Sequence, residues 1–316
     1  IENLFPEYVI YKEDDSYLLK SSGNSISDIS NKGDLTDEFY KALTKANLSF
    51  EKNLACRFIS SLQTKPFVIL TGVSGSGKTK LAESFARWIS EDPEQYCIVP
   101  VGADWTSREP LLGYPDALNP EQYVKDSFGI INLIRNANGN KEKPYFLILD
   151  EMNMSHVERY FADFLSAMES SDRKIPLYDK DEKRELPPEV ELTKNIFIIG
   201  TVNIDETTYM FSPKVLDRAS VIDFRVKAEE IERFLGSPEE PDLGILKHKG
   251  CSMSMDFIRT ANNKDLISIE LDDSIIEFFK ILEEEGAEFG YRTAYEMSRF
   301  LKICQQNTGD SMTKDE

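Results

Sequence analysis

The feature that most constrains the fold is a glycine-rich octapeptide between an apolar run and a helical pattern. The octapeptide spans residues 72–79 and has the sequence GVSGSGKT. The apolar run at residues 66–70 is typical of a buried parallel strand, and residues 81–89 repeat apolar side chains at helical spacing. Glycines let backbone N–H groups turn inward, and a helix N-terminus adds partial positive charge. The three segments together predict a strand, a phosphate-binding loop and a helix.

We expect this loop to hold the phosphates of a nucleotide. The ammonium group of Lys78 would reach the β- and γ-phosphates, and the hydroxyl of Thr79 would hold Mg²⁺. The expected nucleotide-binding residues are Gly72, Val73, Ser74, Gly75, Ser76, Gly77, Lys78, Thr79 and Lys80. The alternative is a glycine-rich turn that binds nothing, but the flanking strand and helix patterns favour a phosphate site.

A second apolar run, residues 145–149, ends in two adjacent carboxylates, Asp150 and Glu151. A buried strand would deliver both acids to the carboxyl edge of an open sheet, which is where ligands bind in such sheets. Asp150 would then bind Mg²⁺, and Glu151 would orient and polarise the attacking water. The alternative is a strand that ends in two solvated acids, and the presence of the phosphate loop argues against it.

A third apolar run, residues 196–201, ends at Asn203. The amide of Asn203 could hold the attacking water or a γ-phosphate oxygen beside Glu151, although an asparagine at a strand end is often only a turn former. Further strand patterns occupy residues 97–101 and 220–224. The fold class that these runs predict is α/β, with a parallel sheet around the nucleotide site.

The composition excludes several other classes of protein. The chain has 316 residues, of which 41% are hydrophobic and 29% charged, which suits two domains or one large domain with a lid. It has no apolar run long enough to span a bilayer and no signal-peptide pattern, so we expect a cytoplasmic protein without a membrane partner. The four cysteines are far apart and show no metal-ligand spacing, and two histidines argue against a histidine-based metal site or triad.

The formal net charge is −19, from 37 basic and 56 acidic side chains. A protein that grips duplex DNA needs basic patches that displace counterions. We therefore expect any contact with DNA to be made through a partner or a missing domain. Solubility alone is enough to explain the excess of acids.

The chain divides into four predicted parts. Residues 1–34 form an unassigned N-terminal segment or linker, and residues 35–235 form the nucleotide-binding domain. Residues 236–250 contain Gly, Pro and Glu and are interpreted as a flexible connector. Residues 251–316 form a helical lid, because residues 275–282 and 291–301 carry apolar side chains at helical spacing.

Local patterns add detail inside the nucleotide-binding domain. Helices are expected from residue 35 to residue 64 and over residues 157–168, each with one apolar face. Partial alternation at residues 173–194 predicts an inserted β-hairpin. The Gly-Tyr-Pro sequence at residues 113–115 predicts a turn, which could line a pore, contact a partner or be an ordinary packed loop.

The order of these motifs resembles the AAA+ ATPase module, over about residues 35–305. In that family they are Walker A, Walker B and sensor 1, followed by an arginine finger and a sensor 2 arginine. The resemblance assigns the last two roles to Arg218 in Leu-Asp-Arg and to Arg292 in the predicted lid, so the expected catalytic residues are Lys78, Glu151, Asn203, Arg218 and Arg292. Arg218 could instead pair with Asp217 or Asp223 in its own subunit.

The resemblance also implies assembly. An arginine finger acts on the nucleotide of a neighbouring subunit and is worth about 10³–10⁵ in rate, or roughly 4–7 kcal/mol, so the monomer would be a poor enzyme. We therefore expect a closed ring of identical subunits, with six as the family expectation. The sensor 2 arginine is expected to touch the γ-phosphate and so to couple hydrolysis to movement of the lid.

Two segments point to one branch of the family. Residues 147–153, LILDEMN, resemble the Walker B strand of McrB-like restriction motors, and residues 200–207 occupy the place of their sensor 1 segment. The hairpin fits the wider clade of MoxR-like and dynein-related modules. The resemblance implies a ring motor for ATP or GTP that works with a separate nuclease in DNA restriction or anti-phage defence. A MoxR-like remodeller of protein partners and a nucleotide-switched scaffold are the alternatives.

Overall fold

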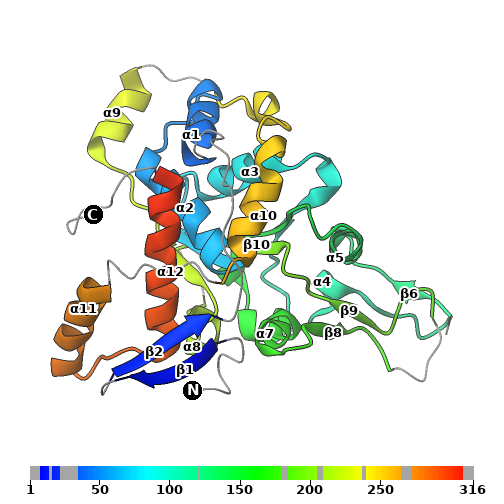
Figure 1. Ribbon diagram of the computed structural model, residues 1–316. Helices are drawn as coiled ribbons and strands as arrows, with labels where there is room; N and C mark the ends of the chain where they lie inside the picture. Colours follow the sequence, from blue (N-terminus) through cyan, green and yellow to red (C-terminus); the bar gives the residue numbers. More distant parts are fainter. Residues whose placement is uncertain are drawn as a thin grey trace.

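The computed structural model describes residues 8–13, 16–21, 35–119, 121–179, 184–204, 209–236, 240–264 and 272–308. Its centre is a five-stranded parallel sheet (Figure 1) in the order β11-β3-β10-β7-β4. The strands are β3 (Phe67–Gly72), β4 (Tyr96–Pro100), β7 (Tyr145–Asp150), β10 (Ile196–Asn203) and β11 (Ser220–Asp223). The α/β fold with a parallel sheet that the sequence predicts is therefore confirmed.

The strand register brings the predicted site residues to one edge of the sheet. Asn203, the last residue of β10, pairs with Gly72, the last residue of β3. On the other side of β10, Gly200 pairs with Leu149, so the next residues, Thr201 and Asp150, lie side by side. Because parallel strands end at the same edge, the phosphate loop, the two acids and the asparagine meet there.

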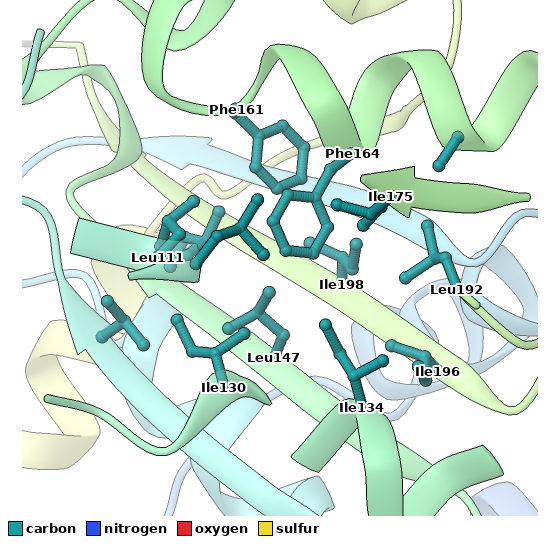
Figure 2. Close-up of a cluster of buried hydrophobic side chains, with 14 of the residues drawn as sticks. Leu111, Ile130, Ile134, Leu147, Phe161, Phe164, Ile175, Leu192, Ile196 and Ile198 are labelled. Atoms are coloured by element: carbon teal, nitrogen blue, oxygen red, sulfur yellow. The ribbon is translucent and has the colours of Figure 1, made fainter. Parts of the chain in front are cut away.

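Alternate strand residues feed two hydrophobic clusters, one on each face of the sheet. Figure 2 shows the first cluster, in which Leu147 and Ile198 meet Phe161 and Phe164. It is covered by α4 (Glu109–Leu112), α5 (Ile130–Gly139), α6 (Val157–Tyr160) and α7 (Ala162–Glu169). The second cluster is covered by α1 (Leu35–Lys45), α2 (Lys52–Thr64), α3 (Lys78–Ile89) and α10 (Ser254–Asn262).

Short helices and antiparallel strand pairs lie outside the central sheet. The single helix predicted over residues 157–168 is two helices, because Phe161 leaves the helical conformation between α6 and α7. Strands β8 (Lys174–Pro176) and β9 (Glu189–Glu191) pair antiparallel within the predicted hairpin, of which residues 180–183 lie outside the described residues. The predicted turn at residues 113–115 leads into β5 (Tyr114–Pro115), which pairs with β6 (Tyr123–Val124). An antiparallel pair, β1 (Tyr8–Glu13) and β2 (Ser16–Ser21), lies in the N-terminal segment.

Of residues 236–250, which the sequence predicts as a flexible connector, the described residues 240–250 pack on the domain. Leu246, in a 3₁₀ helix at Leu243–Leu246, is buried in the second cluster. The N–H of Gly250 donates to the carbonyl of Trp88 at 2.8 Å, and a β-carbon at Gly250 would lie 2.4 Å from the Trp88 indole. Glycine is therefore required where this segment crosses the end of α3, and the segment is packed on the domain.

The C-terminal region joins the same core through two helices. Phe257 of α10 is fully buried against Phe197, with ring centroids 4.9 Å apart. Helix α12 (Tyr291–Thr308) lies alongside α2 (Figure 1), where Arg299 donates to the carbonyl of Thr64 at 2.5 Å and Asn307 donates to Gln63 at 2.8 Å. A boundary between residues 235 and 251 thus does not separate two independent cores, and the predicted division into domains remains a prediction.

Three further helices are α8 (Pro213–Leu216), α9 (Ala228–Gly236) and α11 (Asp272–Glu284). Short 3₁₀ turns occupy Pro93–Gln95, Met152–Met154 and Cys251–Met253. Within the described ranges, the helices are all too short or too polar to cross a membrane.

Candidate active site

The glycine loop between β3 and α3 wraps around the side chain of Lys78. The ammonium nitrogen of Lys78 donates to the carbonyls of Gly72 at 3.0 Å and Val73 at 2.7 Å, and to the hydroxyl of Ser76 at 3.3 Å. Lys78 is only 4% exposed, so these oxygens compensate a buried positive charge. A phosphate group offers the same kind of acceptor oxygen, and the loop therefore fits an anionic ligand.

Glycine is needed at the start of α3. Gly77 has φ 97°, in the left-handed region that favours glycine, and a β-carbon there would lie 3.1 Å from the ring of Phe50. The preceding Gly75 also has a positive φ, 75°. These two turns carry the chain from the sheet edge into the N-terminus of α3, with the partial positive charge of that helix end facing the loop.

Thr79 and Asp150, the two predicted magnesium ligands, are in direct contact. The hydroxyl of Thr79 donates to Oδ1 of Asp150 at 2.5 Å. A hydroxyl and a carboxylate are the hard oxygen ligands that Mg²⁺ takes, usually one or two per protein site with water and phosphate completing the shell. The donor set therefore fits Mg²⁺, and the ion would lie between the phosphate loop and the end of β7.

Glu151 adopts an unusual backbone conformation directly after the strand. It has φ 53° and ψ 48°, the left-handed region, which costs a non-glycine residue roughly 1–2 kcal/mol. Its backbone N–H donates to the hydroxyl of Thr201 at 3.0 Å, and its carboxylate accepts from the amide of Asn203 at 3.2 Å. Backbone strain of this kind clusters at functional sites, because the surroundings must hold it in place.

Asn203 is fixed from both sides. The amide of Asn153 donates to its carbonyl at 3.2 Å, and the next residue, Ile204, donates its N–H to the carbonyl of Gly72 at 3.2 Å. The structure thus gathers five predicted site residues at one edge of the sheet, namely Lys78, Thr79, Asp150, Glu151 and Asn203. Residues 205–208, which include the end of the predicted sensor 1 segment, lie outside the described residues.

Arg218 lies at the opposite side of the sheet, toward the amino-terminal ends of the strands. It precedes β11, whose first residue pairs with Val68 near the start of β3. Its guanidinium group forms an ion pair with Glu169 and donates to the carbonyls of Leu165 and Lys214. The intramolecular partner is therefore Glu169, and not Asp217 or Asp223 as the sequence alternative expected.

Arg292, at the start of α12, lies near the same side of the sheet as Arg218. Its side chain pairs with Glu296 at 2.9 Å, and Glu296 pairs with Lys65 at 2.5 Å, just before β3 begins. Since β3 advances about 3.3 Å per residue, Lys65 and the phosphate loop are roughly 20 Å apart. In the single chain Arg292 is thus held by Glu296, away from the phosphate loop, and its contact with a γ-phosphate stays a prediction.

The two arginines share an electrostatic neighbour. A hydrogen bond from Arg218, with the further positive charges of Arg218, Arg292 and Lys214, outweighs desolvation and lowers the pKa of Glu169 below its usual value. Glu169 ends α7, where the negative end of the helix dipole disfavours an acid. The cations on this side offset that cost, and they form a positively charged cluster around one carboxylate.

Sequence reasoning missed one residue of the site. Thr201 is 2% exposed within β10, and its hydroxyl donates to Asp150 at 2.7 Å while accepting from the N–H of Glu151. The available signal was a hydroxyl in an otherwise apolar strand, two residues before Asn203. A buried polar group of this kind needs partners, and the sheet edge supplies them.

The class of protein follows from these positions. A glycine loop between a parallel strand and a helix, with its lysine enclosed by the loop and its threonine bonded to a carboxylate from a nearby strand, defines a P-loop nucleoside triphosphatase. Residues 67–219 match the family "AAA domain (dynein-related subfamily)", and this part of the chain is accordingly an AAA+ domain of the ATPase type. Residues 246–316 match a domain of unknown function, DUF8727.

Two similar proteins place this result in context. The Type IV methyl-directed restriction enzyme EcoKMcrB subunit of Escherichia coli (strain K12) is 28% identical over 154 residues, which cover 46% of this chain and 32% of that protein. The chain thus spans about a third of the curated relative. A putative ATPase from Cytophaga hutchinsonii has the same fold, with a TM-score of 0.56 and 15% identity over 87% of this chain and 81% of that one.

Proposed function

We propose that this chain is a motor subunit that hydrolyses ATP or GTP within a ring, at the site between the glycine loop and the ends of β7 and β10. The observation that carries the proposal is the meeting of Lys78, Thr79, Asp150, Glu151 and Asn203 at one sheet edge. Phosphoryl transfer needs positioning and charge neutralisation more than covalent chemistry. The five side chains supply both.

In this proposal each side chain has one task. The Lys78 ammonium and the loop N–H groups bind the phosphates, exchanging the loop carbonyls for phosphate oxygens. Thr79 and Asp150 hold Mg²⁺, which neutralises phosphate charge when bound. Glu151 accepts a proton from the attacking water, and the amide of Asn203, which donates to one oxygen of that carboxylate, keeps it aimed.

The site is proposed to be completed by a second copy of the chain. Arg218 and Arg292 lie toward the amino-terminal ends of the strands, away from the phosphate loop at the carboxyl ends, so we infer that they act on a neighbour's nucleotide. Exposed apolar side chains also lie on this side of the sheet. Ile204, 61% exposed, bonds Gly72 of the loop through its N–H, and Met210, 92% exposed, follows Tyr209, whose N–H donates to Asn153. Such side chains are typical of an interface, and a head-to-tail interface that closes makes a ring.

Assembly would require Arg218 to change partner. In the single chain its guanidinium group is held by Glu169 and two carbonyls. A γ-phosphate carries more charge than a carboxylate and accepts the same charge-assisted hydrogen bonds. We infer that a neighbour's nucleotide competes with Glu169 for Arg218, and that hydrolysis therefore rises with protein concentration.

For the cellular role we propose the motor of a cytoplasmic DNA restriction or anti-phage defence system that acts with a separate nuclease. The similarity to the McrB subunit supports it, and the net charge of −19 favours DNA contact through a partner or another domain. The dynein-related match also suits a MoxR-like remodeller of protein clients, which is the alternative.

Hydrolysis of ATP and of GTP, measured side by side over a range of protein concentrations, tests the proposal. We expect specific activity to rise with protein concentration, and DNA with the nuclease partner to stimulate it further. Concentration-independent activity would refute the shared site. Stimulation by a folded protein client, with none by DNA and nuclease, would select the remodeller.

A further inference from the structure

A single buried hydroxyl connects the two acids of the site. Thr201 lies in β10, all of whose residues are buried, and its own exposure is 2%. Every neighbouring position in the strand from Ile196 to Gly200 is apolar or glycine. A hydroxyl in such a place is unfavourable unless its donor and acceptor capacities are used.

Both capacities of Thr201 are used, and each goes to a different acid. The hydroxyl proton is donated to Oδ1 of Asp150 at 2.7 Å. The oxygen accepts the backbone N–H of Glu151 at 3.0 Å. A hydroxyl has one proton and two lone pairs, so it can orient the side chain of one residue and the backbone of the next at the same time.

The two acids need different backbone conformations, and Thr201 sits where the conformation changes. Asp150 is the last residue of β7, whereas Glu151 is left-handed. The turn after Glu151 is closed by the N–H of Met154, which donates to the Glu151 carbonyl at 2.9 Å. With its N–H held by Thr201 and its carbonyl held by this turn, the peptide frame of Glu151 is fixed at both ends.

The carboxylates of Asp150 and Glu151 are also held by side-chain hydrogen bonds. Oδ1 of Asp150 receives hydrogen bonds from Thr201 on β10 and from Thr79 on α3. The Glu151 carboxylate meets the amide of Asn203, two residues beyond Thr201 on the same strand. One strand therefore orients both acids, through Thr201 and Asn203.

We propose that Thr201 is a positioning residue for NTP hydrolysis, which turns the Asp150 carboxylate toward Thr79 and holds Glu151 in the conformation that faces Asn203. The inference rests on the roles proposed for Asp150 and Glu151 and adds a third residue that touches neither nucleotide nor water. Without the hydroxyl, the carboxylate of Asp150 keeps, among the described residues, the donor from Thr79, and the N–H of Glu151 loses its acceptor.

The test compares Thr201→Val, which keeps the shape but removes the hydroxyl, with Thr201→Ser, which keeps the hydroxyl. Thr193→Val is the matched control, because Thr193 is also buried beside β10, at its other end, and its hydroxyl has no hydrogen-bond partner among the described residues. The readouts are kcat, the Mg²⁺ concentration that gives half-maximal hydrolysis, and the affinity for nucleotide in EDTA.

Groups that orient metal ligands are worth about 10–100-fold in activity or metal affinity. We expect Thr201→Val to lower kcat and raise the Mg²⁺ requirement by amounts in that range, with nucleotide affinity in EDTA unchanged. Thr201→Ser should restore most of both losses, and Thr193→Val should behave as wild type.

The inference is overturned if Thr201→Val hydrolyses like the wild type, or if its nucleotide affinity in EDTA falls with its activity, since that pattern indicates general damage to the fold. It is also overturned if Thr201→Ser fails to rescue. A wild-type chain that did not hydrolyse would instead refute the proposed function. In that case the inference is tested by nucleotide affinity measured with and without Mg²⁺. The gain in affinity on adding Mg²⁺ should be smaller for Thr201→Val than for Thr193→Val, and equal gains would overturn the inference.

Discussion

Replacing Phe257 by alanine tests whether the C-terminal region is part of the nucleotide-binding core. Phe257 is fully buried on α10, and its ring centroid lies 4.9 Å from that of Phe197, 5.4 Å from Phe85 and 6.3 Å from Phe146. Removing a buried phenyl ring costs roughly 3–5 kcal/mol in transfer and cavity energy. A domain's whole stability is only about 5–15 kcal/mol, so this change is severe.

The assay is thermal unfolding. Because the unfolding entropy is about 2.1 cal/mol/K per residue, each kcal/mol is worth about 1.5 °C in a chain of 316 residues. Phe257→Ala should therefore lower Tm by about 5–8 °C. Phe257→Leu keeps most of the volume and should cost well under half of that. Phe234→Ala is the matched control, because Phe234 is 53% exposed on α9, and its Tm should stay within about 2 °C of wild type. A Phe257→Ala protein that melts with the wild type would show that α10 does not belong to this core.

The remaining predictions concern the site. Lys78→Ala should abolish nucleotide binding, measured with a fluorescent NTP analogue, because the loop loses its ammonium group; retained affinity would contradict the phosphate site. Glu151→Gln should bind nucleotide but hydrolyse about 10²–10⁴-fold more slowly, and fast turnover by this variant would refute the base assignment. Arg218→Ala mixed with Lys78→Ala should recover activity that neither has alone, since about a quarter of ring interfaces would then be intact; no recovery would count against a finger in trans. Arg218 lowers the pKa of Glu169, so their ion pair stabilises the chain fully above the ordinary glutamate pKa. This stabilisation is lost as the pH falls through the lowered pKa of Glu169. Glu169→Gln should therefore flatten the acid side of the Tm–pH profile, and an unchanged profile would contradict this.

Contiguous patterns made the fold and most of the residues at the sheet edge predictable. Residues 72–79 are recognised as a phosphate-binding loop by their sequence motif alone. The apolar runs before Asp150 and Asn203 predict buried parallel strands. Since parallel strands end at a common edge, the proximity of these residues followed from the strand assignment. The register that places Gly72 beside Asn203 confirms the reasoning.

The remaining features depend on contacts that no local pattern encodes. Helix α10 is only nine residues long, and the segment around Leu246 mixes apolar residues with Gly, Pro, Asp and Lys. Neither pattern shows that both regions are buried against α3 and the sheet. The partner of Arg218 is Glu169, about fifty residues earlier, whereas sequence reasoning considered only nearby acids. Arg292 was assigned by its place in a motif order, which does not say at which edge of the sheet α12 begins.

The most direct test of the central claim is a crystal structure of the chain with Mg²⁺ and a non-hydrolysable NTP analogue. We predict the triphosphate in the glycine loop with its terminal phosphate near Lys78 and Asn203, and the metal beside Thr79 and Asp150. A nucleotide bound elsewhere, or a metal away from Thr79 and Asp150, would contradict the assignment of this sheet edge as the site of hydrolysis.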